Sequence, residues 1–182
     1  MNRIQKTFAR CKAEGKAAYV AYLTMGAPTL AKSFAAAETL LAEGVDVLEL
    51  GVPFSDPVAD GAVIRAAAQR ALANGVTLAD VLAGVSGLRA RHPETPIVIF
   101  TYYNVIYSYG LKRFAEEAAR RGADAVLVVD LPLEERDELL DVLRPVGLTL
   151  VPLIAPTTGP DRVRASTAGV EDSFLYAVTV KG

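Results

Sequence analysis

Cysteine and histidine are almost missing from this chain of 182 residues, which contains one of each, Cys11 and His92. A single cysteine excludes any disulfide within the chain, and this usage fits a reducing cytoplasm, which is the expected location. One cysteine and one histidine also argue against a structural zinc site or a Ser-His-Asp triad, so no metal site is expected.

Long apolar runs and clusters of positive charge are also missing. No stretch reaches the roughly 18 consecutive apolar residues of a membrane span, and the N-terminus lacks the apolar core of a signal peptide. The formal net charge is −2 and Lys and Arg are scattered, so neither nucleic acid nor membrane is an expected partner. With 52% hydrophobic residues, the chain is too apolar for disorder and long enough for a domain with its own core.

What is present alternates between strand-like and helical segments. Strands are predicted at 17–23, 46–50, 96–100 with an aromatic and polar extension at 101–104, 125–129, 148–154 and 173–178. Helices are predicted at 2–14, 30–42, 62–73, 78–91, 111–121, 134–143 and 160–166. Strands that alternate with helices through short loops require a parallel sheet with helices outside it.

Two arrangements of such a parallel sheet are possible, an open doubly wound sheet and a (β/α)8 barrel. The barrel is favoured because no glycine fingerprint of a dinucleotide-binding fold follows the first strand, and because a helix before that strand can close a barrel's bottom. Polar candidates also follow the strand C-terminal ends, where barrels carry their active sites: Glu49, Asp60, Tyr102, Asn104 and Asp130. A complete barrel takes about 250 residues, so we expect a barrel truncated to about six β/α units, a single incomplete domain over residues 1–182.

Two acids stand out in the segment 47–61. Glu49 lies inside an apolar strand, and Asp60 lies near the end of a following loop rich in proline and glycine. An ionised Glu in a dry interior is costly, so its pKa should rise unless it is paired. Two carboxylates at a barrel mouth suit general acid/base catalysis. Structural roles stay open for both: Glu49 can pair with a buried base or a backbone donor, and Asp60 can cap a turn or a helix.

The segment 48–61, LELGVPFSDPVADG, resembles the signature of the tryptophan synthase alpha chain family. The resemblance continues at 101–104 and 122–132, and more weakly at 154–157 and 174–176, so that it covers essentially the whole chain. It implies a (β/α)8 barrel that cleaves indole-3-glycerol phosphate to indole and glyceraldehyde 3-phosphate in tryptophan biosynthesis, a carbon–carbon lyase. It also implies a pyridoxal-phosphate-dependent beta subunit as partner in an alpha2beta2 assembly, while the alpha-type chain itself uses neither cofactor nor metal.

The resemblance also implies catalytic roles. The family's acid/base residue falls on Glu49, which would protonate the indole ring carbon and then take the hydroxyl proton as the carbon–carbon bond breaks. The second carboxylate falls on Asp60, which would accept the indole N–H and stabilise the positive charge. The two pKa values should then diverge, with Glu49 higher and Asp60 lower. Tyr176 matches a position that faces the substrate and Glu49.

Further positions match the family's pocket and its interface. The positions that match the lining of the indole pocket are Tyr22, Phe100, Tyr102 and Ile154. The alternative role for these side chains is ordinary packing in the core of the barrel. Those that match the contact with the beta subunit are Pro53, Phe54, Ser55, Asp56, Pro57, Asn104 and Asp130.

Departures from the family pattern leave other functions open. The family continues beyond Gly182 with a lid and two strands that bind the substrate phosphate, so we expect a fragment with little cleavage activity alone. Ala27 stands where the family often has Asp. One alternative is a non-catalytic alpha-like module that docks on the beta subunit through residues 53–57 and activates it. Another is a different phosphosugar barrel, against which the loop 53–57 argues.

Overall fold

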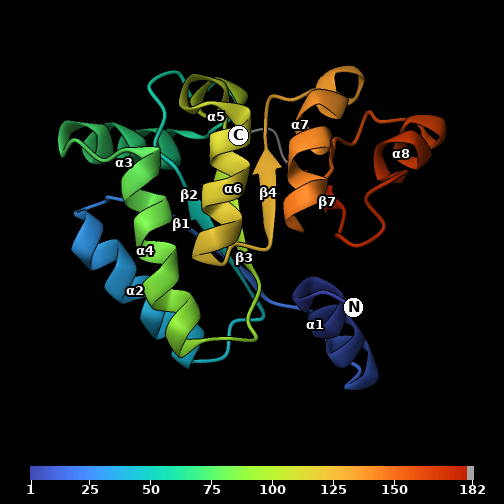
Figure 1. Cartoon of the computed structure of the whole chain (residues 1–182), viewed down its shortest axis with the longest axis horizontal. Helices are drawn as coiled ribbons and strands as arrows, with labels where there is room; N and C mark the ends of the chain where they lie inside the picture. Colours follow the sequence, from blue (N-terminus) through green and yellow to red (C-terminus); the bar gives the residue numbers. More distant parts are fainter. Residues whose placement is uncertain (180–182) are drawn as a thin grey trace.

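Helices and short parallel strands alternate along residues 1–179, which the computed structural model describes (Figure 1). Gly182, beyond which the family is expected to continue, lies outside the described residues. The strands are β1 (Val20–Thr24), β2 (Val47–Gly51), β3 (Ile97–Thr101), β4 (Ala125–Val128), β5 (Thr149–Leu150), β6 (Leu153–Ile154) and β7 (Tyr176–Ala177). The helices are α1 (Arg3–Ala13), α2 (Leu30–Ala42), α3 (Ala62–Ala73), α4 (Leu78–Arg91), α5 (Tyr103–Tyr109), α6 (Leu111–Arg121), α7 (Arg136–Leu143) and α8 (Pro160–Thr167).

The strands follow one another around a wall in the order of the sequence. β1 to β5 form one parallel sheet in the order β1-β2-β3-β4-β5, and β6 pairs with β7 in a second. The two sheets are continuous through the chain between β5 and β6, because Val151 N–H donates to Val126 O at 2.8 Å and Tyr176 N–H donates to Pro152 O at 2.9 Å. Sequential order without a reversal is barrel topology, and it excludes the doubly wound alternative.

The two faces of the wall have separate cores. Successive strand residues point to opposite faces, so Leu48 and Leu50 pack beneath the helices whereas Val47 points inward. The inward side is filled by a group of buried residues that we call the inner cluster: Ile4, Val47, Val98, Ala125, Leu127 and Val151.

The inner cluster is closed at one end by α1, which supplies Ile4 and, at its edge, Phe8. In Figure 1, α1 lies below the tail of the β4 arrow, at the N-terminal ends of the strands. This is the position that was predicted for a helix preceding the first strand. Its N-terminus carries a capping box, in which Asn2 accepts the Gln5 N–H and Gln5 accepts the Asn2 N–H.

Two buried aspartates fasten α1 to that end. Asp124, just before β4, accepts hydrogen bonds from Arg3 at 2.9 Å, from Arg89 at 2.6 Å and from the Ile97 N–H at 2.8 Å. Asp46, just before β2, accepts from Arg10 at 2.5 Å and from the Tyr19 N–H at 3.0 Å. Ion pairs and hydrogen bonds to these two buried aspartates therefore hold α1 at the N-terminal ends of the strands.

Three predicted elements differ from the structure. The extension 101–104 does not continue the strand: β3 ends at Thr101 and α5 begins at Tyr103, whose N–H donates to Asp130 Oδ1 at 2.7 Å. The predicted strand 148–154 is interrupted between β5 and β6, where Pro152 has no N–H to give to a ladder. The predicted strand 173–178 is reduced to β7.

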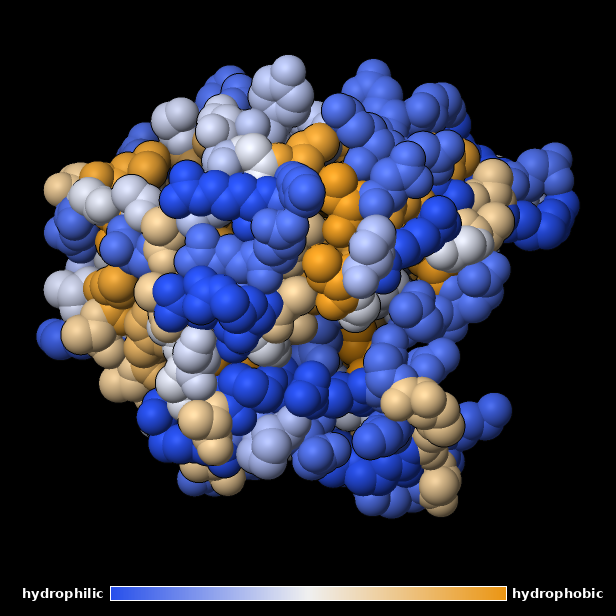
Figure 2. All heavy atoms as spheres, in the orientation of Figure 1, coloured by the Kyte–Doolittle hydropathy of each residue, from blue (hydrophilic) through white to orange (hydrophobic). Residues whose placement is uncertain are grey.

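Polar residues cover most of the face in Figure 2, while hydrophobic residues show between α6 and α7, over β4. In residues 1–179, no single helix is long and apolar enough to cross a membrane. The pair α3 and α4, bent by 98°, passes that test together, by length and composition only.

Candidate active site

Glu49 lies on the inward face of β2, two residues beyond Val47, and is 2% exposed. The parallel register sets Tyr22 of β1 on one side of it and Val98 of β3 on the other. Ala125 and Thr149 continue the same level around the wall on β4 and β5. The carboxyl group is thus directed into the interior of the barrel wall and away from the surrounding helices.

The surroundings of Glu49 keep it dry. Its Oε1 atom is fully buried and has no hydrogen-bond partner among residues 1–179. Burial raises the pKa of the Glu49 carboxyl to about 7, because the charged form loses its water without gaining a compensating charge. No buried base or backbone donor satisfies that oxygen, so the structural alternative is not supported. A carboxyl that titrates near neutrality can both give and take a proton.

The Tyr22 side chain lies against Gly51 at the C-terminal end of β2, two residues beyond Glu49. Its ring meets the Phe100 ring edge-on, with centroids 5.0 Å apart and planes at 72°. Its hydroxyl accepts a hydrogen bond from Thr24 Oγ1 at 3.3 Å. Gly51 makes this placement possible, because a Cβ there would lie 2.3 Å from the Tyr22 hydroxyl.

The predicted catalytic side chains converge on the Tyr22 phenol. The pKa of Tyr22 is raised to about 12, first by burial and then by the charges of Asp60, Glu49 and Tyr176. Tyr176 of β7 packs against the inner cluster, and burial together with the charge of Glu49 raises its pKa. Residues from β1, β2, β7 and the loop after β2 therefore share one electrostatic environment.

Asp60 lies on the loop between β2 and α3 and is held there through Tyr102. Tyr102 is 3% exposed, and its hydroxyl accepts the Ala59 N–H at 3.1 Å. Burial raises the pKa of Asp60, and the nearby Tyr102 hydroxyl and Arg65 offset only part of that rise. The pKa of Asp60 therefore lies above its ordinary value, because the loop buries the carboxyl more than its partners stabilise the charge, and a value below that of Glu49 stays a prediction.

The predicted indole-pocket residues divide into two groups. Tyr22 and Phe100 line the interior, whereas Ile154 is half-buried and lies outside the inner cluster. Its neighbour Leu153 packs against that cluster instead and pairs in register with Tyr176. Sequence reasoning also missed Leu127, at the level of Phe100 on the next strand. Because β4 is apolar and buried throughout, no alternation in its residues marked Leu127, and only its register with Phe100 reveals it.

The predicted partner-contact residues gather on the loop after β2 and around α5. Pro53 is buried, Pro57 is half-buried, and Ser55 and Asp56 are exposed. The Phe54 ring packs on Tyr102, with centroids 4.9 Å apart. Two more residues of the set, Asn104 and Asp130, are exposed at the start of α5. Asp130 also stabilises the N-terminus of α5, because its carboxylate accepts the Tyr103 N–H.

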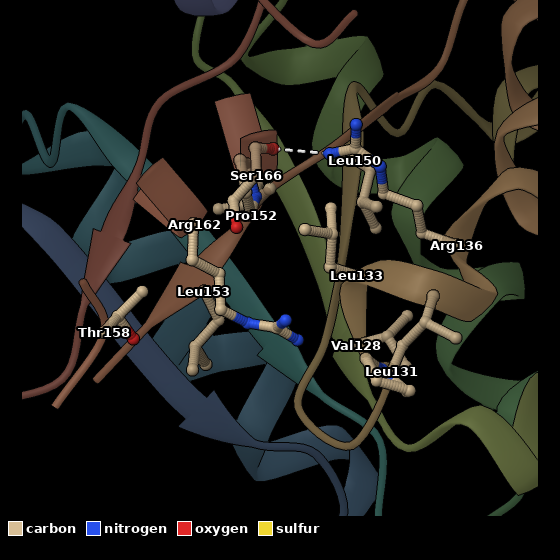
Figure 3. A pocket seen from close by; sticks show the side chains of 12 residues that line it. Val128, Leu131, Leu133, Arg136, Leu150, Pro152, Leu153, Thr158, Arg162 and Ser166 are labelled. Atoms are coloured by element: carbon tan, nitrogen blue, oxygen red, sulfur yellow. Dashed lines mark hydrogen bonds between the residues drawn. The ribbon is translucent and has the colours of Figure 1, made fainter. Parts of the chain in front are cut away.

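A separate cavity of about 110 Å³ opens between β5, the loop after β4 and α8 (Figure 3). Leu131, Leu133 and Leu150 supply apolar walls, and Arg136 reaches past them to donate to Ser166 O at 2.5 Å. Glu49, Asp60 and Tyr176 are not among the lining residues. Ligand sites commonly measure about 300–1,000 Å³, so this cavity is smaller than such sites and is distinct from the predicted one.

Comparison with known proteins identifies the family. A family model described as tryptophan synthase alpha chain matches residues 8–182. The chain is 45% identical to the tryptophan synthase alpha chain of Neisseria meningitidis serogroup B and to that of Chloroflexus aggregans, over all of its length and 69% and 68% of theirs. The chain belongs to the tryptophan synthase alpha chain family.

Solved structures agree with that membership. The alpha subunit from Legionella pneumophila str. Paris superposes with a TM-score of 0.93 at 40% identity, covering 98% of this chain and 68% of that one. A tryptophan synthase structure from Mycobacterium tuberculosis gives 0.92 at 34% identity, covering 100% and 69%. The predicted fold class is therefore confirmed, and the described strands form part of a (β/α)8 barrel wall.

Members of this family catalyse a defined reaction. Tryptophan synthase alpha chains are aldolase-type lyases that cleave indole-3-glycerol phosphate in tryptophan biosynthesis. They have no cofactor of their own and work with a beta subunit. The predicted function is thus confirmed at the level of the family, while the roles of individual residues stay predictions.

Proposed function

We propose that Glu49 is the single acid/base group of the retro-aldol cleavage in this chain. Its carboxyl proton goes to the indole ring carbon that bears the glycerol chain. The resulting carboxylate then takes the proton of the adjacent hydroxyl as the carbon–carbon bond breaks, and the bonding electrons return to the ring. Indole and glyceraldehyde 3-phosphate leave, and Glu49 is protonated again. The observation that carries this proposal is a buried, unpartnered carboxyl whose pKa is about 7.

Asp60 is proposed to accept the indole N–H. Protonation of the ring carbon places positive charge on the ring nitrogen, and a nearby carboxylate stabilises that charge where it develops. The charges of Asp60 and Glu49 both raise the pKa of the Tyr22 phenol. Tyr176 packs against the inner cluster, the charge of Glu49 raises its pKa, and it is proposed to contact the substrate.

The rings around these acids are proposed to hold the indole. Tyr22, Phe100 and Tyr102 provide apolar surface with hydroxyl groups at its edge, as small-molecule sites commonly do. Leu127 and Leu153 are added to this wall on the strength of their inward packing. Ile154 remains a weaker candidate, because it does not join that packing.

We propose that the partner is a pyridoxal-phosphate-dependent beta subunit in an alpha2beta2 assembly. Residues 53–57, Asn104 and Asp130 would form the contact, since residues 53–57 share the β2–α3 loop with Asp60, and both Asn104 and Asp130 are exposed beside the first turn of α5. A loop that is both catalytic rim and docking surface couples partner binding to catalysis. A cytoplasmic location and a single domain over residues 1–182 belong to the same proposal.

The test is Glu49→Gln, which keeps the shape of the side chain and removes its proton transfer. Indole release should fall by about 10²–10⁴-fold, the scale of a lost general acid/base, while binding to a beta subunit is retained. Glu43→Gln is the matched control, because Glu43 is exposed at the end of α2. Unchanged indole release in Glu49→Gln would overturn the acid/base role of Glu49, no indole release by the wild-type chain with its beta subunit would favour the non-catalytic docking module, and a joint loss of activity and binding in Glu49→Gln would make Glu49 structural.

A further inference from the structure

The polar surroundings of Glu49 are strongly one-sided. At its own level on the wall, β3 and β4 contribute Val98 and Ala125, and below it lie Val47 and Ile4 of α1. All four belong to the inner cluster and none can donate a hydrogen bond through its side chain. These four neighbours therefore offer no donor to the carboxylate that Glu49 leaves after giving up its proton, and we look for donors toward the barrel mouth among residues 1–179.

The groups on that side can be counted among the described residues. Tyr22 of β1 pairs in register with Glu49, and Tyr176 of β7 packs against the inner cluster. The charge of Glu49 raises the pKa of both phenols, and the charge of Asp60 raises that of Tyr22 as well. Thr149 of β5 shares the level of Ala125, but its hydroxyl already donates to Asp172 Oδ1 at 2.7 Å. Among the described residues, the two phenols are therefore candidate donors to the Glu49 carboxylate.

Tyr22 is the phenol whose hydroxyl is held in place. Its oxygen accepts from Thr24 Oγ1, so its own proton is free to point elsewhere. The hydroxyl rests against Gly51, which follows Glu49 by two residues on the same face of β2. Two residues along a strand rise about 6.6 Å, and a glutamate side chain extended toward the mouth spans much of that distance.

We propose that the Tyr22 hydroxyl is a positioning group that donates a hydrogen bond to the Glu49 carboxylate after Glu49 has protonated the substrate. The bond holds the carboxylate toward the mouth, where the hydroxyl proton of the substrate is to be taken. This inference rests on the proposed acid/base role of Glu49. It assigns to the Tyr22 hydroxyl a task that the ring alone, as a pocket wall, does not have.

The direct test is a 13C NMR titration of the Glu49 side-chain carboxyl in Tyr22→Phe, with Glu49→Gln used to identify the resonance. Losing a donor to the charged form disfavours that form, so the midpoint should move to higher pH by about one unit or more. The ring and its contact with Phe100 are kept in this variant. Tyr19→Phe is the matched control, because the Tyr19 side chain is 62% exposed and should leave the midpoint unchanged.

Gly51→Ala provides a second test that keeps the hydroxyl but displaces it. Its Cβ would collide with the Tyr22 hydroxyl, so the Glu49 midpoint should move in the same direction. In indole release, Tyr22→Phe should lower kcat about tenfold or more with little change in KM, since the hydrogen bond forms only after proton transfer.

The results of these experiments distinguish the positioning role of Tyr22 from the acid/base role of Glu49. An unmoved Glu49 midpoint in both Tyr22→Phe and Gly51→Ala overturns the positioning role, even where Glu49→Gln abolishes indole release. Full indole release by Glu49→Gln overturns the acid/base role, whatever the titration of Tyr22→Phe shows. A midpoint that moves up in both variants and stays in place in Tyr19→Phe supports the proposal.

Discussion

Asp124 and Asp46 at the N-terminal ends of the strands are buried to nearly the same extent as Glu49 near the C-terminal end, with exposures of 9%, 5% and 2%. Asp124 accepts two guanidinium groups and a backbone N–H. Glu49 has one oxygen with no partner in the described part of the chain. All three acids are buried by solvent exposure, and the supply of hydrogen-bond donors distinguishes the two regions.

The difference separates acids that hold the fold from an acid that is available for chemistry. A buried charge that is fully hydrogen-bonded offsets its loss of hydration, and it is expensive to disturb. The pKa of Asp46 is accordingly lowered, first by the Tyr19 N–H. A buried acid without donors stays protonated near neutral pH, at a cost in stability that is typical of functional sites. Three substitutions test this contrast.

Asp124→Ala should have the largest effect on stability. It leaves Arg89, whose side chain is 13% exposed, as an uncompensated buried charge and frees Arg3 of α1. The free energy of unfolding should fall by about 3–5 kcal/mol, the usual cost of removing one partner of a buried pair. Urea unfolding measures this. Asp141→Ala, an exposed position on α7, should cost far less. Equal losses in the two variants would contradict the fastening role of Asp124.

Glu49→Gln should change how stability depends on pH. The folded pKa of Glu49 is about 7, above the value of roughly 4.3 in an unfolded chain, so the folded state binds the extra proton between these values. Wild-type stability should therefore decline as pH rises from about 4.5 to 7, by about 3 kcal/mol from this group. The Gln variant lacks that decline, and its advantage over wild type should grow from pH 5 to pH 8 in urea titrations. Parallel curves for the two proteins would show that Glu49 is not titrating in this range.

Arg10→Ala should have the smallest effect of the three. The Arg10 side chain is 54% exposed, and Asp46 keeps the Tyr19 N–H when Arg10 is removed. Because solvent screens such a pair, the expected loss is about 0.5–1 kcal/mol in the free energy of unfolding. Thermal unfolding compared with Lys12→Ala, on the same helix, isolates the ion pair. A loss as large as that of Asp124→Ala would mean that both aspartates carry α1 equally.

Some features could be read from residues close together in the chain. Alternation along β2 placed Glu49 on the same face as Val47, and local caps such as Thr29 marked where α2 begins. The helix α5 could not be found in this way, because the side chain that caps its N-terminus belongs to Asp130. Asp130 lies 27 residues after Tyr103, on the loop after β4. The inward position of Leu153 in place of Ile154 likewise depends on how the chain turns at Pro152.

The segment 48–61 alone was enough to indicate the family, and its apolar run with one acid predicted a buried carboxyl with a raised pKa. Those conclusions need only local pattern and the cost of dehydrating a charge. Tertiary structure decided which donors reach each acid. Arg3, Arg89 and Ile97 meet at Asp124 only after the strands have aligned, and Tyr22 reaches over Gly51 only because β1 lies beside β2. Hydrogen bonds act over about 3 Å, so the partners of a buried group are set by packing between distant segments.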